Sequence, residues 1–122
     1  MPHLKLEYSA NIKEKIDLKE LFSSIHSILV DVANADLFRC QSRTISHDSF
    51  YLGEGLPQEG FIYLEILLLE GRSGAQLQEA GNKILKLLEK YFACSFKELN
   101  MQIAVRVVEF PSSHYFKVES RR

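Results

Sequence analysis

Residues 52–60, LGEGLPQEG, divide the chain into two halves of similar layout. Glycines and a proline gather there between segments whose apolar residues recur periodically, and such a cluster marks a turn. On each side of the turn the pattern predicts a strand, a helix and a second strand. The chain of 122 residues therefore reads as one domain with a duplicated β-α-β layout, whose halves cover about 1–56 and 57–122.

The first half carries one helix between two strands. Residues 2–8 alternate between polar and apolar side chains, the pattern of a half-buried strand. An Asp-x-x-Glu start at Asp17, followed by apolar residues at helical spacing, predicts a helix over 18–33. A looser alternation predicts a second strand over 38–51.

The second half repeats this order. Residues 61–69 are apolar at almost every position, as expected for a strand that is covered on both faces. Ser73 and Gln76 form a capping box that predicts the start of a second helix. Alternation then predicts a fourth strand over 101–107, and Pro111 ends it.

The predicted fold is α+β, with two layers. Crossovers of this length favour parallel pairing inside each half, which gives a four-stranded mixed sheet with two helices on one face. Those helices can cover only one face, whereas the strand over 61–69 has the composition of a strand buried on both sides. We therefore expect the bare face to pack against another copy of the chain.

Composition excludes several classes of protein. Hydrophobic residues make up 46% of the chain and charged residues 25%, close to the globular average. A formal net charge of -1 leaves no electrostatic footprint for nucleic acid. No apolar run could span a membrane, and the charged amino terminus has no secretory h-region, so we expect a cytoplasmic protein. Cys40 and Cys94 fall short of a disulfide framework or metal cluster, and we expect two buried thiols.

Pro2 is the first candidate for chemistry. A small second residue normally directs removal of the initiator methionine, which would leave Pro2 with a free secondary amine. A free α-amino group has a pKa of about 7.7–8.0, and burial lowers that value, so the nitrogen would be a usable base near neutral pH. With Met1 in place it is an amide without useful basicity. The structural alternative is that a proline is simply tolerated at the first residue of a strand.

Three short motifs occur in this order along the chain: Met-Pro-His-Leu at the start, Gln41-Ser42-Arg43, and Glu70-Gly71-Arg72-Ser73. With them the sequence resembles, nearly end to end, the 5-carboxymethyl-2-hydroxymuconate isomerase family of the tautomerase superfamily. The resemblance implies a β-α-β pair that assembles as a homotrimer. It also implies an isomerase of aromatic-compound breakdown that needs no cofactor and no metal. Such an enzyme shifts a proton in a 2-hydroxymuconate-type dienol carboxylate, and Pro2 would be its general acid/base.

A small-molecule substrate with several carboxylates requires cations to hold it. By the resemblance, Arg72 binds a carboxylate ahead of the second helix. Otherwise it is a solvated loop arginine or forms a surface ion pair with Glu70. Gln41 stands where relatives carry a functional arginine. Arg39 and Arg43 share strand parity with Gln41, so Arg39 could supply the missing cation, and Arg43 could bind substrate or pair with a carboxylate on the sheet.

Two other functions stay open. Losing one charge-assisted contact at Gln41 costs about 1.5–3 kcal/mol, which would redirect binding toward another small keto or enol acid without ending catalysis. The chain could also be a non-catalytic ligand-binding or oligomerisation module, because this fold alone does not imply function. Near the carboxyl terminus, Lys117 could add a cation, and Tyr115 and Phe116 could line the site or a subunit contact. The four histidines show no metal-ligand spacing.

Overall fold

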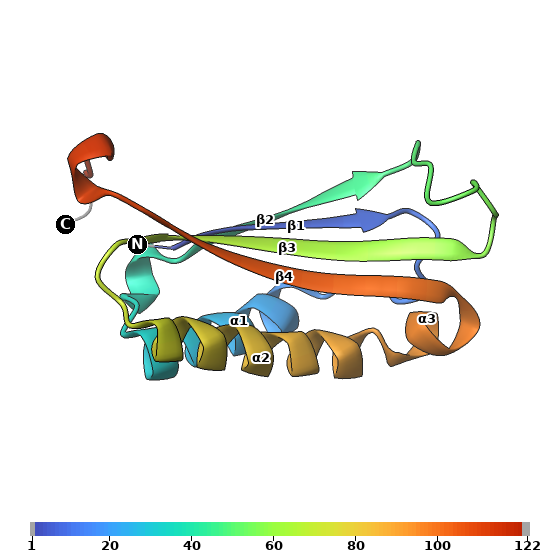
Figure 1. Cartoon of the computed structure of the whole chain (residues 1–122), viewed down its shortest axis with the longest axis horizontal. Helices are drawn as coiled ribbons and strands as arrows, with labels where there is room; N and C mark the ends of the chain where they lie inside the picture. The colour runs from blue at the N-terminus through green and yellow to red at the C-terminus, as the bar shows by residue number, and fades with distance from the viewer. Residues whose placement is uncertain (1, 121–122) are drawn as a thin grey trace.

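The computed structural model describes residues 2–120. Its elements are β1 (His3–Ser9), α1 (Leu18–Ala33), η1 (Leu37–Arg39), β2 (Gln41–His47), β3 (Glu59–Leu69), α2 (Gly74–Tyr91), α3 (Ala93–Glu98), β4 (Asn100–Phe110) and η2 (Ser112–His114). The strands form one sheet in the order β2-β1-β3-β4, and the helices lie on one face of it (Figure 1). Pairing is parallel within each half and antiparallel between β1 and β3. The predicted two-layer α+β fold with a mixed sheet is confirmed.

Alternation along β3 defines the core. Four of its residues point toward the helices and are at most 1% exposed: Ile62, Leu64, Ile66 and Leu68. Each such side chain contributes about 1.5–3 kcal/mol by leaving water. The residues between them, such as Tyr63 and Leu67, are only half-buried on the opposite face. Within one chain, therefore, β3 is covered on one face and not on both.

Local capping signals place the helix ends. The side chain of Asp17 accepts the N–H of Glu20 at 3.1 Å, and Asn34 ends α1 in the left-handed conformation. At the start of α2, Ser73 and Gln76 exchange both bonds of a capping box. The Gln76 amide also donates to the carbonyl of Val32 at 3.2 Å. The end of α1 and the start of α2 therefore lie together.

The predicted strand over 38–51 is wrong at both ends, because β2 covers only Gln41–His47. Asp36 accounts for the later start. Its side chain accepts the N–H of Phe38 at 3.1 Å, and its carbonyl accepts the N–H of Arg39 at 3.0 Å, which winds the chain into η1. Arg39 therefore lies on a helical turn, and the argument from its strand parity with Gln41 fails.

The prediction that both cysteines are buried is also wrong. Cys94 is exposed on α3, a short helix that follows α2, and its thiol donates to Glu98 at 2.8 Å. Cys40 is only half-buried.

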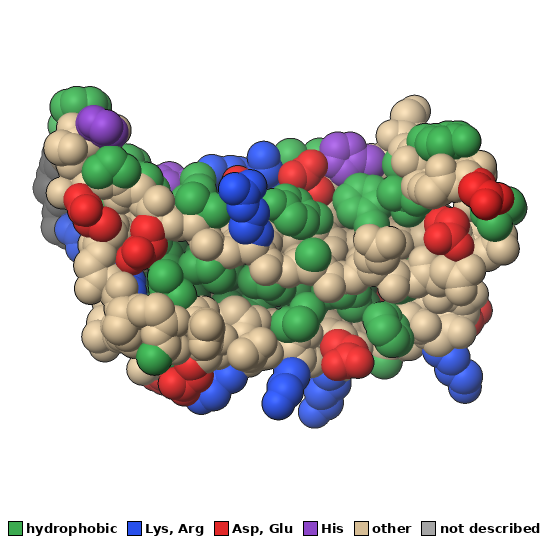
Figure 2. Space-filling view, in the orientation of Figure 1, with side chains coloured by type: hydrophobic (Ala, Val, Ile, Leu, Met, Phe, Trp, Pro, Cys, Tyr) green, Lys and Arg blue, Asp and Glu red, His purple; other side chains and the backbone are tan. Residues whose placement is uncertain are grey.

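Hydrophobic and positively charged side chains lie on different parts of the molecular surface. Figure 2 shows hydrophobic side chains along the seam between the sheet and the helices, whereas Lys and Arg project from the outer side of the helix layer. Leu77, Met101 and Ile103 are partly buried residues that pack against the core. None of the helices over residues 2–120 is long and apolar enough to cross a membrane.

Candidate active site

One end of the sheet collects the residues that the sequence singled out. Because β1 and β2 are parallel, both begin at this end, and antiparallel β3 ends there. His3 pairs with Gln41 on one side and with Leu67 on the other. Pro2 therefore lies beside Gln41, and Arg72 follows β3 in a short loop at the same end of the sheet. In Figure 1 the loop between β3 and α2 lies near the N mark.

Pro2 is buried immediately before β1. Its carbonyl oxygen accepts the N–H of Gln41 at 3.0 Å, which holds the residue against the first position of β2. Burial is the environment that lowers the pKa of an amine, because it disfavours the charged form. The predicted removal of Met1 concerns a residue outside the described range.

Arg72 is held firmly by backbone oxygens. It follows Gly71, whose φ of 126° favours glycine. Its Nε donates to the carbonyl of Ala33 at 2.8 Å, and its Nη1 donates to the carbonyl of Leu69 at 2.9 Å. The side chain thus joins the end of α1 to the end of β3, and within residues 2–120 its Nη2 has no hydrogen-bond partner.

The alternative pairing of Arg72 with Glu70 is wrong. The carboxylate of Glu70 accepts the N–H of Ser112 at 2.8 Å instead. The backbone N–H of Arg72 donates to Glu109 at 3.1 Å. The guanidinium is therefore positioned by the carbonyl groups of Ala33 and Leu69.

Gln41 and Arg43 are exposed and share the bare face of the sheet with His3. Arg43 lines a small cavity of about 80 Å³ together with His3, Lys5 and Glu65. Across the described part of the chain, Arg43 forms no ion pair, so it does not pair with a sheet carboxylate. Burial, followed by the charge of Arg43, lowers the pKa of His3.

Arg39 is paired with two carboxylates, those of Asp36 and Glu119. Hydrogen bonds with Glu119 and Asp36 raise its pKa. Glu119 belongs to the segment after β4, which returns to the Pro2 end of the sheet (Figure 1). There the hydroxyl of Tyr115 and Nε2 of His3 lie 2.9 Å apart. The sequence pattern did not reveal Glu119, because no periodicity or motif marks it.

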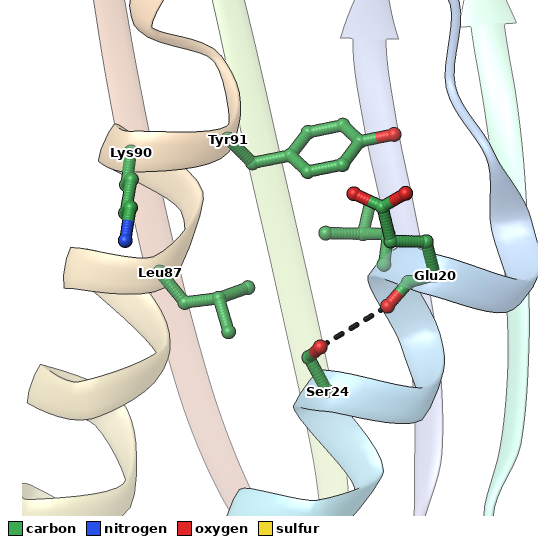
Figure 3. A pocket seen from close by; sticks show the side chains of 6 residues that line it. Glu20, Ser24, Leu87, Lys90 and Tyr91 are labelled. Carbon is green, nitrogen blue, oxygen red and sulfur yellow. Dashed lines mark hydrogen bonds between the residues drawn. The ribbon is translucent and has the colours of Figure 1, made fainter.

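A separate groove of about 470 Å³ lies between the helices (Figure 3). Its lining includes Glu20 and Ser24 from the start of α1, and Leu87, Lys90 and Tyr91 from the end of α2. These are the helix ends opposite to those near Pro2, so the groove is not part of the candidate site. Within residues 2–120, no group of three His, Cys, Asp or Glu side chains could hold a metal ion.

We expect His26 to make the stability of the fold depend on pH. Its Nε2 lies 2.6 Å from the hydroxyl oxygen of Ser42, and the ring of Phe22 packs nearby. Burial lowers the pKa of His26 below 6.5. The native state then binds fewer protons than the unfolded chain, so the free energy of unfolding should fall as the pH drops below 6.5.

Urea unfolding at about pH 7.5 and about pH 5.5 measures this effect. The loss of stability on acidification should be smaller in His26→Gln than in the wild type. His3 titrates in both proteins, so the difference isolates His26. Equal losses would contradict the assignment.

Comparison with known structures defines the class of fold. A crystal structure of a 5-carboxymethyl-2-hydroxymuconate isomerase from Deinococcus radiodurans R1 superposes with a TM-score of 0.88 at 23% identity, covering 98% of this chain and 90% of that chain. A macrophage migration inhibitory factor-like protein from Entamoeba histolytica gives a TM-score of 0.65 at 20% identity, covering 98% and 96%. The fold is that of the tautomerases.

Sequence comparison then identifies the family. The Escherichia coli 5-carboxymethyl-2-hydroxymuconate Delta-isomerase is 26% identical over 117 residues, which are 96% of this chain and 93% of that protein. The sequence profile of the 5-carboxymethyl-2-hydroxymuconate isomerase family matches residues 2–121, and the chain belongs to this family. The protein is an isomerase.

Proposed function

We propose that this isomerase moves a proton within a 2-hydroxymuconate-type dienol carboxylate, with the amine of Pro2 as general acid/base after Met1 is removed. The observation that carries the proposal is that buried Pro2 is hydrogen-bonded to Gln41 at the end of the sheet where the loop with Arg72 follows β3. The name of the Escherichia coli relative supports the substrate class.

The chemistry needs one base and several fixed cations. The unprotonated Pro2 amine takes the proton of the substrate's 2-hydroxyl group, and the electron pair moves along the conjugated carbons. The Pro2 ammonium then returns that proton to a carbon, which gives the 2-oxo isomer with protons balanced and no redox change. Arg72 would bind one carboxylate through its Nη2, and Arg39, Arg43 and Gln41 would line the remaining positions.

We also propose that the chain assembles as a homotrimer through the bare face of the sheet. Half-buried apolar residues such as Phe61, Tyr63 and Leu67 support this, because they alternate with the core residues of β3 and have no helix above them.

An isomerase assay on 5-carboxymethyl-2-hydroxymuconate, followed by the loss of dienol absorbance, tests the proposed reaction. Rapid turnover without added cofactor is expected. Binding of a saturated dicarboxylate such as adipate without turnover of any such dienol would instead support the non-catalytic module. A second candidate, a tautomerase of another small keto or enol acid, is favoured by the neutral side chain of Gln41.

Gln41→Arg is expected to lower KM for the carboxymethylated substrate about tenfold or more. The new guanidinium would supply one charge-assisted contact of about 1.5–3 kcal/mol beside Pro2. A decrease in KM of this size would mean that the natural substrate has one carboxylate fewer than the carboxymethylated substrate. Gln78→Arg, at an exposed position of α2, is the control for added charge. An equal KM in both variants would argue against a substrate carboxylate near residue 41.

A further inference from the structure

The carboxylate of Glu119 is held by two cations. Nε of Arg39 donates to its Oε2 at 2.9 Å, and Nη2 of Arg39 contacts its Oε1 at 3.4 Å. Nζ of Lys117 forms an ion pair with the same carboxylate. Hydrogen bonds with Lys117 and Arg39 lower the pKa of Glu119, so this group is ionised at neutral pH. A guanidinium that faces both oxygens is a frequent arrangement for recognition of a carboxylate.

The cation pair of Arg39 and Lys117 lies at the end of the sheet where Pro2 is buried. Arg39 precedes Gln41 by two residues, which span at most about 7 Å of chain, and the N–H of Gln41 donates to the Pro2 carbonyl at 3.0 Å. Lys117 follows Tyr115, whose hydroxyl lies 2.9 Å from Nε2 of His3. Two segments far apart in sequence thus bring Arg39 and Lys117 to the same end of the sheet as the proposed base.

Asp36 explains how this cation pair keeps its geometry. Nη1 of Arg39 pairs with the Asp36 carboxylate, so the remaining donors of the guanidinium turn toward Glu119. The side chains of Arg39 and Glu119 are 43% and 30% exposed. An exposed pair of this kind is weak, and an incoming anion can exchange with the tail carboxylate.

We infer that Arg39 and Lys117 form a subsite for a substrate carboxylate, and that Glu119 is its intramolecular occupant, which substrate displaces. This inference rests on the proposed function. The subsite is separate from position 41, because Arg39 lies on η1, two residues before Gln41. A carboxylate tethered on a short segment has an effective concentration on the order of millimolar, so Glu119 competes with substrate and raises KM.

Glu119→Gln tests the inference directly. Removing the competing charge should lower KM about two- to fivefold and leave kcat unchanged. Arg39→Gln should raise KM about tenfold, and Glu119→Gln should have no further effect in that background. Glu79→Gln is the matched control, because Glu79 is an exposed acid paired with Lys83 at 2.9 Å on the outer side of α2.

Calorimetric titration with adipate, a saturated dicarboxylate, gives a readout that does not depend on turnover. Adipate should bind more tightly to Glu119→Gln and more weakly to Arg39→Gln and Lys117→Gln than to the wild type. If the proposed reaction fails, this titration still tests the subsite.

Unchanged adipate affinity in all three variants would overturn the inference even if the wild type is an active isomerase. A tail contact that is only structural predicts a different result. In that case Glu119→Gln would lower the unfolding midpoint or change nothing, and would not tighten binding.

Discussion

Pro2→Ala is expected to lower kcat by about 10²- to 10⁴-fold, the range that a positioned general base contributes. Proline offers a secondary amine inside a buried ring, whereas alanine would leave a primary amine that rotates freely and lacks the ring contacts. The carbonyl of Pro2 would keep its bond to the N–H of Gln41 in both proteins, so the strand pairing should survive. Steady-state kinetics on the dienol substrate, with intact mass to establish removal of Met1, measures the effect.

A second variant distinguishes the role of the Pro2 nitrogen from the role of the proline ring. Insertion of a lysine between Met1 and Pro2 should retain the methionine and leave the Pro2 nitrogen as an amide. Activity should then be lost although the proline ring is present. Pro57→Ala, in the exposed turn before β3, is the control and should keep full activity. An inserted variant as active as the wild type would show that the base lies elsewhere.

Much of the fold could be predicted because its signals are local. The side chains of Asp17 and Ser73 cap the two long helices where the sequence places them, since a capping bond spans only three residues. Asp36 shows the limit of this approach. Its side chain winds the next residues into η1, and a loose polar alternation in the sequence conceals that turn within an apparent strand.

The candidate site was partly predictable for a similar reason. The family resemblance singles out Gln41 and Arg72 as well as Pro2, and strand order brings the starts of β1 and β2 to the end of β3. The contact between Arg39 and Glu119 joins residues 80 positions apart. It depends on how the segment after β4 folds back, and no periodic pattern in the sequence carries that information.

Arg72→Ala is expected to have two effects, because the same guanidinium would bind the substrate and stabilise the fold. The carbonyls of Ala33 and Leu69 would lose their donors, which should lower the free energy of unfolding by about 1–3 kcal/mol. Loss of the proposed carboxylate contact should raise KM about 10- to 100-fold. Urea unfolding and steady-state kinetics measure the two effects separately.

Arg72→Lys distinguishes the two roles of this side chain. Lysine keeps the positive charge but cannot bond both carbonyls and a ligand in one plane, so KM should stay above that of the wild type. Lys83→Ala, which removes an exposed cation from α2, is the control for loss of charge and should leave KM unchanged. If Arg72→Ala lowers stability while KM keeps its wild-type value, Arg72 only joins α1 to β3. The substrate carboxylate would then depend on Arg39 of η1, Arg43 of β2 and Lys117 of the carboxyl-terminal segment.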